Sequence, residues 1–240
     1  MIRNYKALGL AMMALAAFGA IAAQGASANP LTVSGIAAGG TVHITGTTDK
    51  NEKGESSIHT LVVEPGLEVK CTHALYHGHA VVGAGGVVNH MTLGPEYTGC
   101  SAFGFATAHV KVNGCTYTLT TPTKLKAGEV TWHASANPEI SQIHVICPVG
   151  KKIEITPTSF GVSVCTASVG EQTPTAGHLV ARNEVTSETI TDEATVEGVT
   201  YTSTNSACGK GGNTAKFTGN TTATCYSNEA HTIQVGCTFS

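Results

Sequence analysis

Charged residues are scarce in this chain of 240 amino acids: aspartate, glutamate, lysine and arginine together make up 12%. An average globular protein has about 25%. The formal net charge is −3, and lysine and arginine are not gathered into a basic patch. Nucleic acids and anionic membrane surfaces are recognised by such patches. We therefore expect neither of them as a partner.

Catalytic signatures are also missing. Asp49 and Asp192 are the only aspartates, so a Ser-His-Asp triad lacks its usual orienting acid and an aspartate-rich calcium loop is strongly disfavoured. The segment 161–165 lacks the second glycine of a nucleophile elbow, and 208–212 lacks the frame of a phosphate-binding loop. Aromatic residues make up 5% of the chain, with a single tryptophan, which disfavours a carbohydrate-binding platform. We predict a protein without catalytic residues or a cofactor.

What the sequence does have begins with an N-terminal targeting signal. Arg3 and Lys6 form a short positive region, residues 7–23 are uncharged and apolar, and small residues lead to Ala28. This order is typical of a secretory signal peptide with an A-x-A cleavage site. The alternative is an uncleaved membrane anchor, for which the apolar run is short. We predict cleavage after Ala28 and a protein that is secreted or held at the cell surface.

The rest of the chain predicts an all-β protein. Short runs rich in threonine and valine alternate between apolar and polar residues and are bounded by Gly, Pro or Asn, as in an antiparallel β-sandwich. No long segment after the signal has the apolar spacing of a helix. The predicted strands are 41–47, 104–112, 115–120, 129–132, 143–147, 152–156, 161–165, 194–196, 199–202, 215–217 and 232–237.

Two Gly-containing dipeptides, Asn113-Gly114 and Glu197-Gly198, predict tight hairpin turns between such runs. The segments around them, 112–118 and 196–202, resemble each other. Two further pairs of similar segments occur in the same order: 63–72 with 155–166, and 143–147 with 233–237. This order predicts an internal repeat of two related β halves, residues 29–150 and 151–240. The alternative is chance resemblance among strands of similar composition.

Eight cysteines follow the signal, four in each predicted half. An even number of cysteines after a secretory signal indicates disulfides, although eight allow 105 pairings. Pairing within each half is the economical hypothesis. A metal site is disfavoured because no C-x-x-C pair occurs and the compartment is oxidising. The predicted disulfides are Cys71–Cys100, Cys115–Cys147, Cys165–Cys208 and Cys225–Cys237.

Three histidines form the one cluster that suggests a metal. On a strand His77 and His79 share a face, and His73 can share it too, so that their imidazoles could bind zinc or copper. Gly78 could break this strand, and the second half has no matching histidines. We favour a polar strand face in solvent over a metal site.

Several blocks around the cysteines resemble one known group of proteins. The blocks are 70–72, 97–106, 112–117, 144–155 and 230–236. The chain resembles secreted proteins without an established activity that are abundant as paralogues in soil actinobacteria of the thermoleophilic lineage. The resemblance covers nearly the whole chain after the signal. It implies secretion and a cysteine-containing β-rich fold, but no site residue. Cys225 and Cys237 are additional to the six cysteines usual in that group.

These observations predict a non-catalytic extracellular binding or surface module of unknown ligand or cell-envelope partner. The alternative is a structural protein of the envelope or matrix that self-associates. Low charge and threonine-rich strands such as 115–121 would leave sheet edges open to strand addition. A secreted hydrolase or a metal-binding protein is less well supported.

Overall fold

The computed structural model describes residues 31–48, 57–63, 66–184 and 188–239. The predicted signal peptide, 1–28, lies outside the described residues. The described chain is all-β, with two short 3-10 helices, η1 (Ala84–Gly86) and η2 (Ser206–Cys208). Within it, no helix has the length and apolar character needed to cross a membrane.

The strands are β1 (Leu31–Val33), β2 (Thr41–Thr48), β3 (His59–Val63), β4 (Leu67–Val81), β5 (Val87–Val88), β6 (His90–Ala102), β7 (Ala106–Lys111), β8 (Thr116–Thr120), β9 (Thr123–Lys126), β10 (Glu129–His133), β11 (Ile143–Ile146), β12 (Ile153–Ser159), β13 (Val162–Ser163), β14 (Ala167–Val169), β15 (Ala176–Glu184), β16 (Thr189–Ser203), β17 (Gly212–Tyr226), β18 (Gln234–Val235) and β19 (Cys237–Phe239). They form a 16-stranded sheet and a 3-stranded sheet, and the strand pairs are antiparallel, as predicted.

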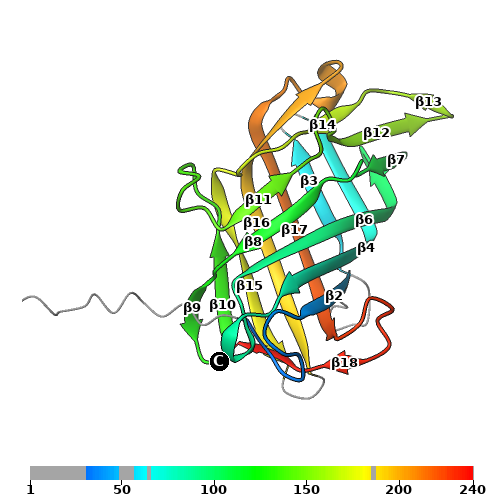
Figure 1. Cartoon of the computed structure of the whole chain (residues 1–240). Helices are drawn as coiled ribbons and strands as arrows, with labels where there is room; N and C mark the ends of the chain where they lie inside the picture. Colours follow the sequence, from blue (N-terminus) through cyan, green and yellow to red (C-terminus); the bar gives the residue numbers. More distant parts are fainter. Residues whose placement is uncertain (1–30, 49–56, 64–65, 185–187, 240) are drawn as a thin grey trace, which may run out of the picture.

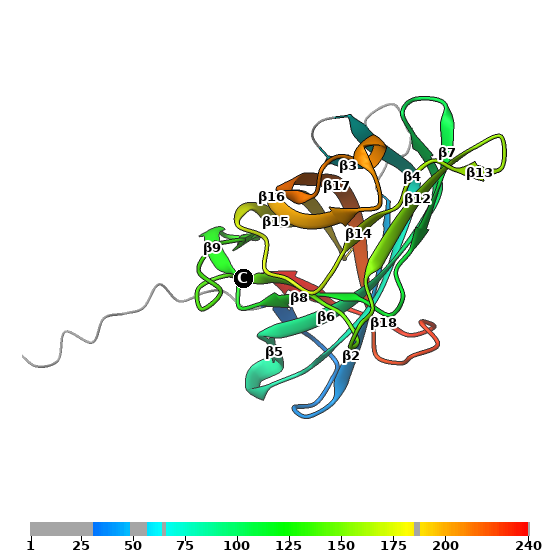
Figure 2. The ribbon, with the colours of Figure 1, turned by 90° about the horizontal axis from the view of Figure 1, so that it is seen from above.

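The large sheet closes on itself. From β17 the pairings run through β2, β4, β6, β7, β12, β14 and β16, and β16 pairs with β17 again. The layer containing β4, β6 and β8 crosses the layer containing β15, β16 and β17 at a steep angle (Figure 1). Seen from above, the strands surround a common interior (Figure 2). The fold thus has the two packed layers of a sandwich, and the pairing continues from one layer into the other.

Strands from the two predicted halves form blocks that pair with each other in this sheet. β7 pairs with β12, β10 with β15, and β2 and β3 with β17. Both halves therefore contribute to one continuous core. The division into 29–150 and 151–240 stays a prediction.

The small sheet, β19-β1-β5, covers one end of the interior. Leu31 of β1 and Phe239 of β19 are buried, and the Phe239 ring meets Trp132 of β10 edge-on with centroids 5.8 Å apart. The Asn183 side chain holds β19 in place, because its Nδ2 donates to the Phe239 carbonyl (2.8 Å) and its Oδ1 accepts from the Phe239 amide (2.9 Å). Segments from both ends of the described chain thus form this cap.

Four disulfides are present: Cys71–Cys100, Cys115–Cys147, Cys165–Cys208 and Cys225–Cys237. These are the pairs that the sequence predicts, and each joins cysteines of the same predicted half. Cys71 and Cys100 face each other on β4 and β6. Each bridge stabilises the fold by about 2–4 kcal/mol in the chain-entropy description.

The two predicted hairpins have different outcomes. Asn113 and Gly114 form a tight turn, with φ of 55° and 79°, but the strands it joins diverge, since β7 pairs with β12 and β8 with β11. The predicted hairpin at Glu197-Gly198 is wrong: this dipeptide lies inside β16. There Val196 pairs with Phe217 and Val199 with Ala215, which leaves one extra residue on β16. The glycine at positive φ serves a β-bulge rather than a chain reversal.

The threonine-rich strand 115–121, predicted to offer an open edge, is covered on both sides. Its central part, β8, pairs with β6 and with β11. One end of the strand order is instead β9, in which all four residues are exposed and two are lysines, Lys124 and Lys126. Lysine on an edge strand opposes strand addition. This arrangement disfavours self-association through β8 or β9.

Two other turns carry phenylalanine where the backbone favours glycine or asparagine. Phe103 and Phe160 have φ of 54° and 50°, each followed by a glycine at positive φ, as in the Asn113-Gly114 turn. The Phe160 side chain is 104% exposed, so packing does not offset the backbone cost of about 1–2 kcal/mol for a left-handed residue. Asparagine accepts this conformation more readily.

We expect Phe160→Asn to stabilise the protein by about 0.5–1 kcal/mol, because it relieves that backbone cost. Urea unfolding of the oxidised protein measures the change. The matched control is Phe105→Asn, which removes a side chain that is 79% exposed from a residue without positive φ. Equal effects of the two substitutions would contradict the backbone explanation.

Candidate functional site

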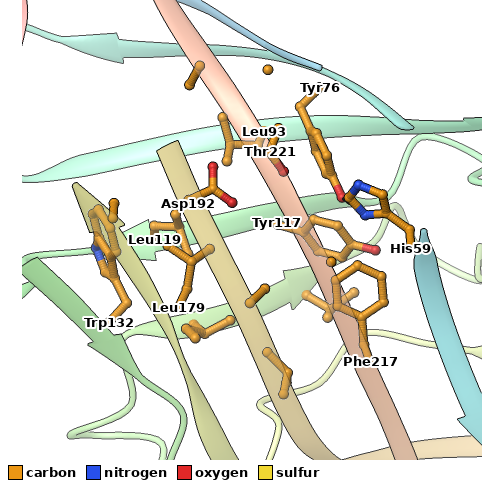
Figure 3. Close-up of a pocket in the computed structure, with 18 of the residues that line it drawn as sticks. His59, Tyr76, Leu93, Tyr117, Leu119, Trp132, Leu179, Asp192, Phe217 and Thr221 are labelled. Atoms are coloured by element: carbon orange, nitrogen blue, oxygen red, sulfur yellow. Dashed lines mark hydrogen bonds between the residues drawn. The ribbon is translucent and has the colours of Figure 1, made fainter. Parts of the chain in front are cut away.

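A cavity of about 180 Å³ lies between the two layers. Inward-facing residues from most strands line it, and nearly all of them are apolar. Engineered apolar cavities of about 150 Å³ bind benzene, so this space is large enough for a small organic molecule. Figure 3 shows His59, Tyr76, Tyr117 and Phe217 grouped on one side and Trp132, Leu119 and Leu179 on the other.

Strand alternation explains why polar groups reach this interior at few positions. On β16 the side chains of Ile190, Asp192, Ala194 and Val196 line the cavity, because every second residue of a strand points to the same face. The intervening Glu193 is exposed. Asp192 is thus the one carboxylate among these inward-facing residues of β16, and the other three are apolar.

Three tyrosines from neighbouring strands form a chain of hydroxyl groups. Tyr76 comes from β4, Tyr97 from β6 and Tyr117 from β8. The Tyr76 and Tyr97 hydroxyl oxygens are 3.2 Å apart, and those of Tyr97 and Tyr117 are 3.0 Å apart. Tyr76 Oη also lies 3.4 Å from His59 Nδ1. Because a hydroxyl can donate and accept, the chain can be hydrogen-bonded in either direction.

Burial raises the pKa of Tyr76, Tyr97 and Tyr117 well above 10, and the nearby phenols add to the effect through mutual repulsion of their charged forms. Desolvation disfavours a phenolate in this apolar surrounding. The three hydroxyls therefore stay protonated at neutral pH, and they present a neutral polar strip rather than a charged one.

His59, the first residue of β3, is 2% exposed. Burial lowers the pKa of its imidazole below the usual 6.5, and a backbone hydrogen bond with Asn220 acts in the opposite direction. The ring packs against the backbone of β17, where a Cβ at Gly219 would collide with it. Among the described residues, His59 Nε2 has no hydrogen-bond partner. The cavity wall therefore contains a buried, unsatisfied ring nitrogen.

Asp192 and Thr221 face each other across β16 and β17. In Figure 3 they lie between the group that contains His59 and the group that contains Trp132. The charge of Asp192 contributes to the raised pKa of Tyr76. Together with His59 and the tyrosines, they are the main polar side chains of a cavity that is otherwise apolar. This combination suits a molecule with an apolar body and few hydrogen-bonding groups.

The three sequence-predicted metal candidates lie elsewhere. His73, His77 and His79 are exposed on the outer face of β4, where His77 stacks on His231 with ring centroids 5.7 Å apart. His231 in turn lies near His43, at 6.2 Å. Within the described ranges, no three His, Cys, Asp or Glu side chains are arranged to hold a metal ion. The prediction that His73, His77 and His79 lie on a solvent-facing strand is confirmed.

Sequence reasoning did not select His59, the three tyrosines or Asp192. Asp192 had a usable signal, because it interrupts the apolar alternation of 190–196. Tyr76 likewise shares the inward parity of Ala74 and Ala80 on β4. His59 had no such signal, since its burial depends on how β3 packs against Gly219 of β17.

No protein-family model, curated protein or solved structure matches the chain. The resemblance to actinobacterial secreted proteins stays a prediction.

His59 should make stability depend on pH. Its folded pKa lies below 6.5, so between the folded and unfolded pKa values the unfolded chain binds more protons. The neutral His59 imidazole therefore contributes fully to the free energy of unfolding above about pH 6.5. This contribution is lost as the pH falls toward the pKa of His59 in the folded protein. We expect the free energy of unfolding to decrease from pH 7.5 to 5.5, and the decrease to be smaller in His59→Gln.

Urea unfolding at a series of pH values measures this slope. His109→Gln is the control, since His109 is exposed on β7. An unchanged slope in His59→Gln would show that the buried imidazole does not titrate in this range.

Proposed function

We propose that the protein is a non-catalytic extracellular binding protein that holds one small, largely apolar molecule in the cavity between its layers. The observation that carries this proposal is the cavity of about 180 Å³ with its apolar wall and few polar groups. A well-formed apolar pocket with convergent polar groups is the usual form of a small-molecule site.

The size of the cavity limits the ligand. Because a cavity of about 150 Å³ binds benzene, the space of about 180 Å³ accommodates a molecule slightly larger than benzene. This corresponds to a single ring with a small substituent rather than a long lipid or a peptide.

The fold supports binding without large rearrangement. The closed sheet leaves the ring strands β2, β4, β16 and β17 paired along their lengths, and the Cys71–Cys100 bridge ties β4 to β6 beside the cavity. A preformed site loses less entropy on binding than a flexible one. The four disulfides also suit an extracellular setting, because such bonds persist in oxidising compartments.

Two features support binding rather than catalysis. The tyrosine hydroxyls stay protonated, because burial raises their pKa, so they are poor general bases near neutral pH. The hydroxyl next to His59 belongs to Tyr76, and a buried phenol is a weaker nucleophile than the serine or cysteine that a histidine base usually activates.

Self-association through strand edges has less support, given the pairing of β8 and the lysines of β9.

Filling the cavity should abolish binding. Ala194 is buried and lines the cavity, so we expect the phenyl group of Ala194→Phe to occupy the ligand volume. Ethylbenzene serves as the probe, in isothermal titration calorimetry and in thermal unfolding. The wild-type protein should bind it and show a higher Tm, and Ala194→Phe should lose at least tenfold in affinity.

Ala136→Phe is the control, because Ala136 is exposed on the loop after β10; it should bind ethylbenzene like the wild type. Absence of binding to the wild-type protein by both ethylbenzene and its hydroxylated analogue 4-ethylphenol would overturn the proposed function. Unchanged binding by a folded Ala194→Phe variant would place the site outside this cavity.

A further inference from the structure

The unsatisfied Nε2 of His59 calls for an explanation, because buried polar atoms in native proteins nearly always have a hydrogen-bond partner. The imidazole is 2% exposed and lines the cavity, and its Nε2 has no partner among the described residues. Leaving such a group unpaired is unfavourable. A ligand in the cavity is placed to supply the missing partner.

The tautomer of His59 decides what that partner must be. A neutral imidazole has one N–H donor and one nitrogen that accepts. Nδ1 lies against β17 at Gly219 and 3.4 Å from Tyr76 Oη, and a backbone hydrogen bond with the neighbouring Asn220 favours the protonated ring. A proton on Nδ1 is compatible with both neighbours, and Nε2 then presents a lone pair to the cavity.

The surroundings of this lone pair are aromatic. The His59 ring has centroid distances of 6.0 Å to Tyr76, 6.2 Å to Tyr97 and 6.0 Å to Phe217. Figure 3 shows His59, Tyr76, Tyr117 and Phe217 clustered at one side of the cavity. Ring edges and faces at such distances favour a further aromatic ring in offset or edge-on contact.

We propose that His59 carries its proton on Nδ1 and that the ligand is a small phenol, whose hydroxyl group donates a hydrogen bond to His59 Nε2 while its ring packs among Tyr76, Tyr97 and Phe217. The inference rests on the proposed function, since it names the ligand class of the same cavity. The phenol stays neutral, so no charge is buried and no covalent step is involved.

Hydrogen-bond complementarity makes this site selective. A phenol satisfies Nε2, whereas the corresponding methyl ether has no donor and leaves the nitrogen unpaired in an apolar surrounding. A site that pairs with a substrate hydroxyl rejects analogues that lack it. We expect 4-ethylphenol to bind about 10- to 100-fold more tightly than 4-ethylanisole.

Calorimetric titration of the oxidised protein with these two probes tests the inference. His59→Phe keeps an aromatic ring but removes the nitrogen acceptor, so it should reduce the preference to less than about threefold while 4-ethylanisole binds as before. His77→Phe, on the outer face of β4, is the matched control and should keep the full preference. A preference that survives in a folded His59→Phe variant would overturn the assignment of His59.

The outcomes separate the two proposals. If the wild-type protein binds ethylbenzene and binds phenol and ether equally well, the phenol inference is wrong and the proposed function stands. If it binds none of the three probes, the proposed function itself fails.

Nitrogen-15 NMR of the wild-type protein gives a second readout that needs no variant. The His59 resonances should show Nδ1 protonated and Nε2 unprotonated in the free protein. Addition of 4-ethylphenol should shift the Nε2 resonance, and addition of 4-ethylanisole should leave it nearly unchanged. A proton on Nε2 in the free protein would overturn the inference, because the nitrogen could then only donate.

Discussion

Backbone hydrogen bonds from β17 to both β2 and β16 close the large sheet, and the interior of the protein depends on this closure. A closed sheet leaves the ring strands without a free edge over most of their length. It also forces every second side chain of each strand into one shared space. Whether that space is filled or left open then depends on the sizes of the inward residues. At Gly46, Ala181, Ala194 and Gly219 these residues are small, and all four positions line the cavity.

The cavity combines two demands that oppose each other. Apolar walls exclude water and favour an apolar guest, while the same low polarity makes each unpaired polar atom costly. The tyrosine hydroxyls meet this demand by hydrogen-bonding one another. His59 meets it only at Nδ1. Among the described residues that line the cavity, His59 Nε2 and Trp132 Nε1 are buried nitrogens without a hydrogen-bond partner. They lie on opposite sides of it, His59 beside the tyrosines and Trp132 on β10 (Figure 3).

The fold class and the disulfide pairs could be predicted because their signals are local or compositional. Threonine- and valine-rich alternation marks strands such as 41–47, and β2 begins at the predicted residue. The long strands were harder to recognise. Gly78 suggested a break, yet β4 continues through it. A glycine is needed at this position because a Cβ would collide with Leu93 and the Thr92 carbonyl of β6. That glycine permits close approach of a neighbouring strand and does not end its own.

The polar side of the cavity could not be predicted from the sequence. His59, Tyr76, Tyr97 and Tyr117 lie on four strands, and only the register of those strands brings their side chains together. The local sequence was also insufficient at Glu197-Gly198. This dipeptide is compatible with a turn or a bulge, and only the pairing of Val196 and Val199 with β17 determines that it forms a bulge.

The seam between β2 and β17 joins Thr41–Thr48 to residues more than 160 positions further along the chain. Contacts between such distant segments form slowly, because a long loop must be ordered before they contribute any stability. The disulfides, in contrast, span separations of 12 to 43 residues. We therefore expect the local bridges to form before the seam between β2 and β17. A chain in which that seam is still open would expose apolar side chains, which favours aggregation.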